Sequence, residues 1–340
     1  MERIDLDLIL AKAESTYATD PTPTPAANAL PVKKGSISYS VSSNYNERQI
    51  SDGVSRRLAG TITQKTVKLE FTLELRGNRT DGATPDISAG SSSYALRYHC
   101  LMAAAHLLAA YTAELSGGSR DGYVTYKPYV PVDEGPSVTC YFFTEKKKHI
   151  LTGGKVESVE FSYKAGGFVD VKFVVMGLYN AVTDNTFATT LSTVAFEAPS
   201  LKPPAWTGAA VTYNGVTPTL ETVTFSVKNE VGQRNDAVAT DGVKGFAITK
   251  GPLVTGTIDP ETVAEATNAY WADFASGEVD TLVVPLGTLT GNKVTITATC
   301  QQTGPGYATR GGSRTYNIPF NVVASGLDTA TGAEFAVKIF

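Results

Sequence analysis

The sequence predicts an α+β fold that is mostly β, with one helix in each of two domains, and three observations support this class. First, apolar residues occupy every second position within the segment 61–76, namely Val67, Leu69, Phe71, Leu73 and Leu75. A period of two is typical of a strand with one buried and one wet face. Second, 31 glycines and 16 tyrosines against 3 methionines favour strands and turns. Third, 340 residues correspond to about two domains of roughly 150 residues each.

Residues 1–34 are predicted to form an extended N-terminal arm. Pro21, Pro23 and Pro25 stand at every second position. Proline restricts its own φ and keeps the preceding residue out of the α region, so the segment is expected to be close to polyproline II. The apolar residues of 26–32 then need a surface that buries them. The arm is therefore expected to lie either on another subunit or along its own domain.

The first domain is expected over residues 35–198. Strands are predicted at 35–41, 61–76, 137–143, 156–163 and 169–176, with a polar loop over 42–60 and another loop over 77–90. A loop as long as 42–60 is usually functional. Residues 93–115 are predicted to be a buried helix, because Cys100, Ala103 and Leu107 belong to a stripe at three- and four-residue steps. Gly117 is expected to end that helix.

The second domain is expected over residues 199–340, after a linker within 183–206 that contains Pro199, Pro203 and Pro204. A strand at 222–228, a polar loop at 229–243 and an extended pair at 244–258 are predicted. A helix follows, with Asp259 as its N-cap, Pro260 as its first residue and Gly277 as its end. Strands are predicted at 280–285, 293–300, 315–323 and 334–340. Both halves share this element order, which leaves an internal duplication and a chance resemblance both open.

Composition and charge exclude several classes of function. The net charge is −4, so tight binding to a phosphate backbone is not indicated. No stretch of about 18 apolar residues occurs, so no membrane span is predicted. The first seven residues lack a basic region followed by a long apolar one, and no secretory leader is expected.

Motifs for catalysis or ligand binding are absent from the sequence. There is no P-loop, nucleophile elbow, His-Glu-x-x-His or Cys-x-x-Cys, and no catalytic, cofactor or metal residue is predicted. The three cysteines, Cys100, Cys140 and Cys300, are too far apart to indicate a disulfide framework. His99 and His106 are interpreted as packed or subunit-facing residues, and their roles stay open. The basic run 146–149 is interpreted as a solvated hairpin turn in preference to a nucleic-acid contact.

The features that stand out instead suit assembly. A proline-rich arm, long polar loops beside strands and apolar helices are parts that a ring or tube would need. Closed rings remove exposed sheet edges by pairing each edge with a neighbour. The residues alone therefore predict a β-rich assembly protein.

The segment from Leu10 to Leu30 resembles the N-terminal arm of a family of tailed-bacteriophage tail tube proteins. That arm typically carries Lys-x-Glu-x-Thr-Tyr-Gly-x-Asp-Pro-x-Pro-Thr, and this chain matches it from Lys12 through Thr24, with Ala18 in place of the usual glycine. Residues 58–77, 137–154, 166–184 and 203–206 are similar to later stretches of the family.

The resemblance implies two tail-tube-like domains, each a β-sandwich or barrel, whose inner strands close with those of neighbouring subunits into a ring. Stacked rings would form the tube through which DNA leaves the capsid. The implied partners are copies of this chain and other tail proteins, with DNA passing through without specific binding, no cofactor and no membrane. The implied location is the virion, after synthesis in the bacterial host cytoplasm. Trimeric rings with pseudo-sixfold symmetry are favoured over hexameric rings.

The resemblance also implies roles for particular residues, since long loops and arms of this family reach the next ring. The candidate inter-ring contacts are Ala11, Glu14, Tyr17, Asp20, Pro21, Pro23, Asn44, Tyr45, Arg48 and Arg56. A bore that passes DNA should carry acidic or neutral side chains, and Glu70, Glu74 and Asp170 are the candidate lumen-facing residues.

Other interpretations were weighed against this one. Another structural module of a phage tail, such as an adhesin or tail-tip domain, would not form stacked tubes. A carbohydrate-active enzyme would need two carboxylates about 5–10 Å apart in a groove, and no motif selects such a pair. A secreted sugar-binding β-sandwich is the remaining alternative, which the absence of a leader disfavours.

Overall fold

The structure is a computed structural model that describes residues 7–51, 56–77, 97–112, 123–129, 135–185, 202–288, 292–324 and 334–340. In this part of the chain the protein is mainly antiparallel β-sheet, as the sequence predicts. Its strands are β1 Leu8–Ala13, β2 Ala29–Leu30, β3 Ser38–Arg48, β4 Leu58–Glu74, β5 Leu107–Thr112, β6 Tyr123–Pro128, β7 Val138–Phe143, β8 Lys147–Lys164, β9 Asp170–Tyr179, β10 Thr183–Asp184, β11 Thr212–Tyr213, β12 Thr222–Asn235, β13 Val243–Ile258, β14 Val279–Leu286, β15 Val294–Gln302, β16 Gly306–Arg310, β17 Ser313–Val322 and β18 Phe335–Ile339. Three short helices accompany them, α1 Pro25–Asn28, α2 His99–Ala104 and α4 Tyr270–Ser276.

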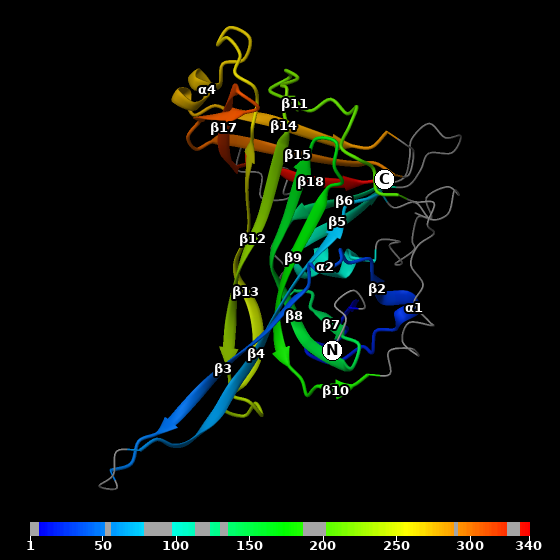
Figure 1. The fold of residues 1–340 in the computed structure, drawn as a ribbon, viewed down its shortest axis with the longest axis vertical. Helices are drawn as coiled ribbons and strands as arrows, with labels where there is room; N and C mark the ends of the chain where they lie inside the picture. Colours follow the sequence, from blue (N-terminus) through cyan, green and yellow to red (C-terminus); the bar gives the residue numbers. More distant parts are fainter. Residues whose placement is uncertain are drawn as a thin grey trace.

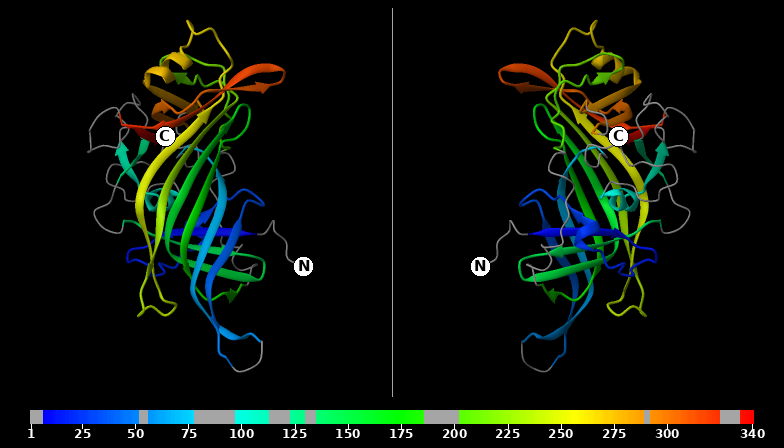
Figure 2. Two further views of the ribbon diagram at one scale, coloured as in Figure 1. Left: turned by 90° about the vertical axis from the view of Figure 1, so that its left-hand side faces the viewer. Right: turned by 90° about the vertical axis from the view of Figure 1, so that its right-hand side faces the viewer.

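Three long hairpins form the central sheet of the molecule. Hydrogen-bonded pairs give the strand order β3–β4–β9–β8–β12–β13, all antiparallel, and β13 continues to β17 at its upper end. Figure 1 shows this sheet nearly edge-on, and the left view of Figure 2 shows one face of it. The β3–β4 hairpin projects beyond the body at the bottom of Figure 1.

The other face of this sheet holds the hydrophobic core. Alternate residues of its strands, such as Phe71, Phe173, Phe161 and Phe225, are at most 1% exposed. Helix α2 and two further groups of strands pack on that face. One group pairs β2 with β1, β1 with β7 and β7 with β8, and the other runs β5–β6–β18–β15–β14–β11. A single continuous core therefore joins the two halves of the chain.

The long helix predicted at 93–115 is wrong within the described residues. Helix α2 spans only six residues, and His106 follows it with a φ of 58°, which no helix continues through. Residues 107–112 then form β5 and pair with β6. The alternation of buried and exposed side chains in Leu107–Thr112 also fits a strand. The segment therefore suits both the helical repeat of 3.6 residues and the strand repeat of two, and pairing with β6 selects the strand. Residues 93–96 and 113–115 lie outside the described part of the chain.

The second predicted helix is also shorter than expected. Helix α4 begins at Tyr270, and the segment 259–269 is irregular. The Asp259 carboxylate does not cap a helix, because it accepts the backbone N–H groups of Glu221 and Thr222 at 3.0 and 2.7 Å. The predicted end is confirmed, since Gly277 takes the left-handed conformation, with φ 70°, that terminates α4.

The two polar loops, 42–60 and 229–243, are also corrected, since most of their residues continue the flanking strands. Strand β3 runs to Arg48 and β4 starts at Leu58, while β12 runs to Asn235 and β13 starts at Val243 as one strand rather than an extended pair. Sequence periodicity missed these extensions because the alternation appears only where one face is buried. Of the predicted linker and the loop 77–90, residues 186–201 and 78–90 lie outside the described residues.

Candidate assembly surfaces

The polar face of the central sheet carries all three candidate lumen-facing residues. Glu70 and Glu74 lie on β4 and Asp170 on β9, on the face opposite the core. Strand register adds serine and threonine from β8 and β12 to the same face. The charged side chains that β4, β9, β8 and β12 place on this face include Lys68, Lys164, Lys172 and Lys228 together with Glu70, Glu74, Glu157, Glu160, Glu230 and Asp170.

Ion pairs across the strands balance this charge. Glu70 lies between two lysines, 2.9 Å from the Lys172 ammonium and 3.4 Å from that of Lys68. The hydrogen bond from Lys172 lowers the pKa of Glu70, which stays ionised at neutral pH. Asp170 accepts from Lys33 at 2.7 Å. The face is therefore hydrophilic and close to neutral, and it is not lined by excess positive charge.

The β3–β4 hairpin presents the second group of candidate residues to solvent. Asn44, Tyr45, Arg48 and Arg56 are all exposed, and the Tyr45 side chain is 56% exposed. The Tyr45 hydroxyl accepts the N–H of Gly60 on the facing strand at 2.9 Å, which braces the hairpin. These four residues are available for contact with another molecule.

The N-terminal arm lies on its own chain, the second of the two placements expected for it. Ala11, on β1, is buried and pairs with Cys140 of β7. The Glu14 carboxylate accepts four hydrogen bonds, from the hydroxyls of Ser137 and Thr139 at 2.6 Å each and from the N–H groups of Gly153 at 2.7 Å and Ala18 at 2.8 Å. These bonds fasten the arm to β7 and to the bulge of β8.

Further along the arm, Asp20, Pro21 and Pro23 also make contacts within the chain. Asp20 accepts the Tyr141 hydroxyl in a short hydrogen bond, and the Pro21 carbonyl accepts the Lys12 ammonium at 2.8 Å. Pro23 is buried. These residues of the arm are therefore held against their own chain.

Tyr17 ties the β12–β13 hairpin to the arm. Its hydroxyl accepts the N–H of Phe246 at 2.6 Å and lies 3.2 Å from the carbonyls of Phe246 and Gly153. Beneath the ring, the ammonium of fully buried Lys155 lies 5.6 Å from its centroid and donates to the carbonyls of Gly135 and Pro136. Nothing in the sequence marks Lys155 as buried, because a lysine within a strand pattern normally points to solvent.

The central sheet has open borders in the described residues. Strand β3 pairs only with β4, and Val41 on its core-side face is 47% exposed because no strand covers it from beyond the border. At the opposite border, β13 pairs with β17 only through Thr255–Ile258. An open border with exposed apolar side chains is a site for pairing with another chain.

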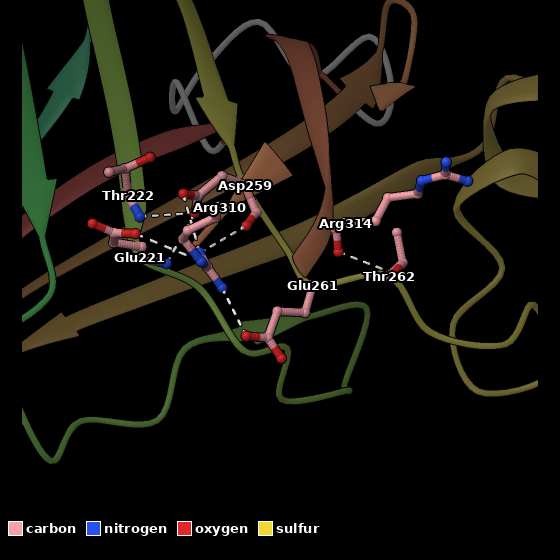
Figure 3. Close-up of polar contacts among 7 residues, drawn as sticks. All are labelled: Glu221, Thr222, Asp259, Glu261, Thr262, Arg310 and Arg314. Carbon is pink, nitrogen blue, oxygen red and sulfur yellow. Dashed lines mark hydrogen bonds and ion pairs between the residues drawn. The ribbon is translucent and has the colours of Figure 1, made fainter. Parts of the chain in front are cut away.

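Another hairpin, β16–β17, lies at the upper end of the sheet. Arg310 of this hairpin pairs with carboxylates of neighbouring segments (Figure 3). The Arg310 guanidinium lies 3.3 Å from Asp259, 3.0 Å from Glu261 and 3.5 Å from Glu221. Arg314, on the next strand, accepts the Thr262 hydroxyl through its carbonyl at 3.1 Å. Three carboxylates around one guanidinium give this cluster a net negative charge.

The histidines and cysteines show no sign of a reactive role. Burial lowers the pKa of His99 to about 4, and burial together with the nearby Lys155 lowers that of His106 to about 4, so both rings are neutral at pH 7. The three cysteines are free thiols, and burial raises the pKa of Cys100 to about 12. Among the described residues no group of His, Cys, Asp or Glu is placed to hold a metal ion, and none of their helices is long and apolar enough to cross a membrane.

Open sheet borders, a projecting hairpin and a near-neutral polar face define a class of protein that acts by associating with other chains. Comparison with family models gives the particular family: residues 8–324 match the model of the phage tail tube protein family, so the chain belongs to that family. It is a structural protein of the phage tail and hence of the virion, and the family is not one of enzymes. A search among curated proteins found no match.

Proposed function

We propose that this protein builds the tail tube by forming closed rings that stack into a conduit for DNA ejection. The observation that carries the proposal is the central sheet, which ends in two open borders, in a chain of the tail tube family. Pairing β3 of one copy with the opposite border of the next copy would remove both edges at once. Other tail proteins would meet the ends of such a tube, after synthesis in the host cytoplasm.

A strand pairing within the chain resembles the junction proposed between subunits. Strand β8 pairs with β12 through seven residues, Ser158–Lys164 against Thr222–Lys228, and this pairing joins the two halves of the sheet. On one side the order is β3–β4–β9–β8, and on the other it is β12–β13–β17–β16. The matching order supports two tail-tube-like domains over 35–198 and 199–340 that arose by duplication. Three such chains would give a ring with pseudo-sixfold symmetry, with a hexameric ring as the alternative.

The polar face is the surface that would line the bore. Lys68 and Lys172 on this face are paired with carboxylates, and in the described residues the face carries more carboxylates than lysines, so DNA would meet a hydrated surface without net positive charge. A near-neutral lining does not retain the phosphate backbone, because that attraction depends on excess Lys and Arg. Glu70, Glu74 and Asp170 are thus proposed as lumen residues that let DNA pass without specific binding.

Contacts between rings are proposed mainly for the β3–β4 hairpin. Asn44, Tyr45, Arg48 and Arg56 are exposed. The β3–β4 hairpin that carries them projects beyond the body of the subunit (Figure 1). Ala11, Glu14 and Tyr17 make their contacts within the chain, so their proposed part in stacking is to hold the arm in place. Asp20, Pro21 and Pro23, which follow Tyr17 along the arm, complete the proposed set.

Electron microscopy of the purified protein tests the proposal, with a matched pair of variants on β3. Val41→Asp places a charge on the core-side face at the open border, and Ser40→Asp places the same charge on the polar face of the same strand. Both side chains are exposed in the subunit, so both variants should fold. Wild type and Ser40→Asp are expected to form rings and tubes, whereas Val41→Asp should stay as single subunits. Rings formed equally well by Val41→Asp would show that β3 is not the junction.

A further inference from the structure

The turn between β12 and β13 carries the most exposed apolar side chain among the described residues. Val238 is 92% exposed, and its neighbours on both sides are alanines. An isolated exposed aliphatic residue needs no explanation. This one, however, stands at the tip of a long hairpin, and the tripeptide 237–239 contains no charged side chain. It therefore forms a small apolar knob.

The knob is held in a defined position. The Asp236 side chain accepts the N–H of Val238 at 2.9 Å, and backbone hydrogen bonds link Asp236 with Ala239 and with Gly242. The turn is also anchored to β4, where the N–H of Gln64 donates to the Asp241 carbonyl at 2.8 Å and the Lys65 ammonium lies 3.2 Å from the Asp241 carboxylate. A preorganised knob loses little conformational entropy when it is bound.

An uncharged pocket lies on another part of the molecule. It has a volume of about 380 Å³ and lies between the β8–β9 turn and the segment 206–220. Its lining includes Trp206, Ala210, Val211, Pro218 and Leu220, and no charged side chain lines it. The backbone of Trp206 is fixed to the turn by hydrogen bonds with Gly166 at 3.1 Å and Gly167 at 2.9 Å, so the pocket is part of the fold.

We propose that Val238 of one subunit inserts into the 206–220 pocket of a subunit in the adjacent ring, an inference that rests on the proposed stacking of rings. In Figure 1 the β12–β13 turn, which carries Val238, lies toward the lower end of the molecule, and β11, which belongs to the 206–220 segment, lies toward the upper end. A knob and a pocket at opposite ends make a head-to-tail contact, which leaves a free knob and a free pocket at every step. Such a contact extends without limit along an axis, as a tube requires.

Charge selects this knob over the other projecting tip. The β3–β4 hairpin carries Arg48, Arg56 and Arg57 near its tip, and an uncharged pocket would strip water from these guanidiniums without replacing it. The acidic group around Arg310, with Glu221, Asp259 and Glu261, lies next to the pocket in the chain and is the better match for those arginines. The apolar tip of β12–β13 is thus the occupant that the pocket fits.

Disulfide trapping in assembled tubes tests the proposal. The double variant Val238→Cys/Ala210→Cys, oxidised after assembly and run without reductant, is expected to give a ladder of dimers, trimers and longer species. All variants also carry Cys100→Ala, because that native thiol is only half-buried. Each single variant should then stay monomeric on the gel, because the remaining native thiols, Cys140 and Cys300, are buried. The matched control Ser51→Cys/Ala210→Cys places the thiol on the other hairpin tip and should give no ladder. A ladder from that control, or dimers from Val238→Cys alone, would overturn the assignment.

A charge exchange gives an independent readout of stacking. Val238→Asp should unfold at the wild-type temperature, because the side chain is solvated in the free subunit, and should shorten tubes at least tenfold while rings persist. Adding Ala210→Lys to that variant should restore tube length. Wild-type-length tubes from Val238→Asp would refute the knob while leaving rings and stacking intact, whereas failure of the wild type to stack would refute the proposed function itself.

Discussion

Replacing Glu14 by alanine should destabilise the isolated subunit, because the arm docks on its own chain before any assembly. The carboxylate accepts four hydrogen bonds within 2.8 Å, and three of the donors belong to buried residues of the body, Ser137, Thr139 and Gly153. Alanine leaves all three donors without this acceptor. The structure therefore predicts a large effect from one residue of an arm that looks detachable in sequence.

The size of the effect follows from the energetics of charged hydrogen bonds. Each is worth about 1.5–3 kcal/mol, and the four share one carboxylate and are not additive. A loss of about 3–5 kcal/mol is expected, because three buried neutral donors lose their acceptor at about 1–3 kcal/mol each. At roughly 2–3 °C per kcal/mol for a chain of this size, the unfolding temperature should fall by about 6–15 °C.

Thermal unfolding of dilute, unassembled protein measures this loss. Glu47→Ala is the matched control, because Glu47 lies on the exposed β3–β4 hairpin and pairs only with Arg57, whose side chain is 91% exposed, among the described contacts. Such surface pairs are worth about 0–1 kcal/mol. If Glu14→Ala and Glu47→Ala unfold at the same temperature, the arm is not docked in the free subunit and its contacts belong between subunits.

Three further predictions concern other parts of the chain. Gly245→Ala places a Cβ into the Tyr17 ring, so limited proteolysis should cut the arm faster than in wild type, and an unchanged rate would contradict the Tyr17 contact. Burial, with nearby carboxylates, raises the pKa of Asp273 to about 6. The stability that this carboxyl contributes is therefore complete below about pH 4 and is lost as the pH rises through 6. The variant Asp273→Asn should unfold at a higher temperature than wild type at pH 8, and the difference should vanish at pH 4. Lys172→Met should raise the pKa of Glu70 toward its usual value in a carboxyl NMR titration, and no movement would mean that this ion pair does not form in solution.

The residue pattern alone was sufficient for the β class, the long strand β4, the end of α4 at Gly277 and the membership of the tail tube family. The turn predicted over 146–149 is wrong, because the chain turns before Lys147 and residues 147–149 already belong to β8. Each of the confirmed features depends on neighbours in sequence: alternation at every second residue, a glycine that accepts positive φ, or the spacing of the motif from Lys12 to Thr24. These local signals do not depend on the conformation of the rest of the chain.

Tertiary structure decided the features that depend on distant partners. Residues 107–112 suit both a helix and a strand, and β6, which the chain reaches only later, made them a strand. The polar extensions of β3 and β12 carry no alternation, because neither of their faces is buried within the subunit, and their pairing with β4 and β13 could not be seen in composition. The sheet brings residues more than a hundred positions apart together where Lys155 is buried and where Glu14 docks. It also brings the β8–β9 turn against the 206–220 segment, and this forms the pocket beside Trp206. Such long-range contacts are set by packing, which no local run of residues specifies.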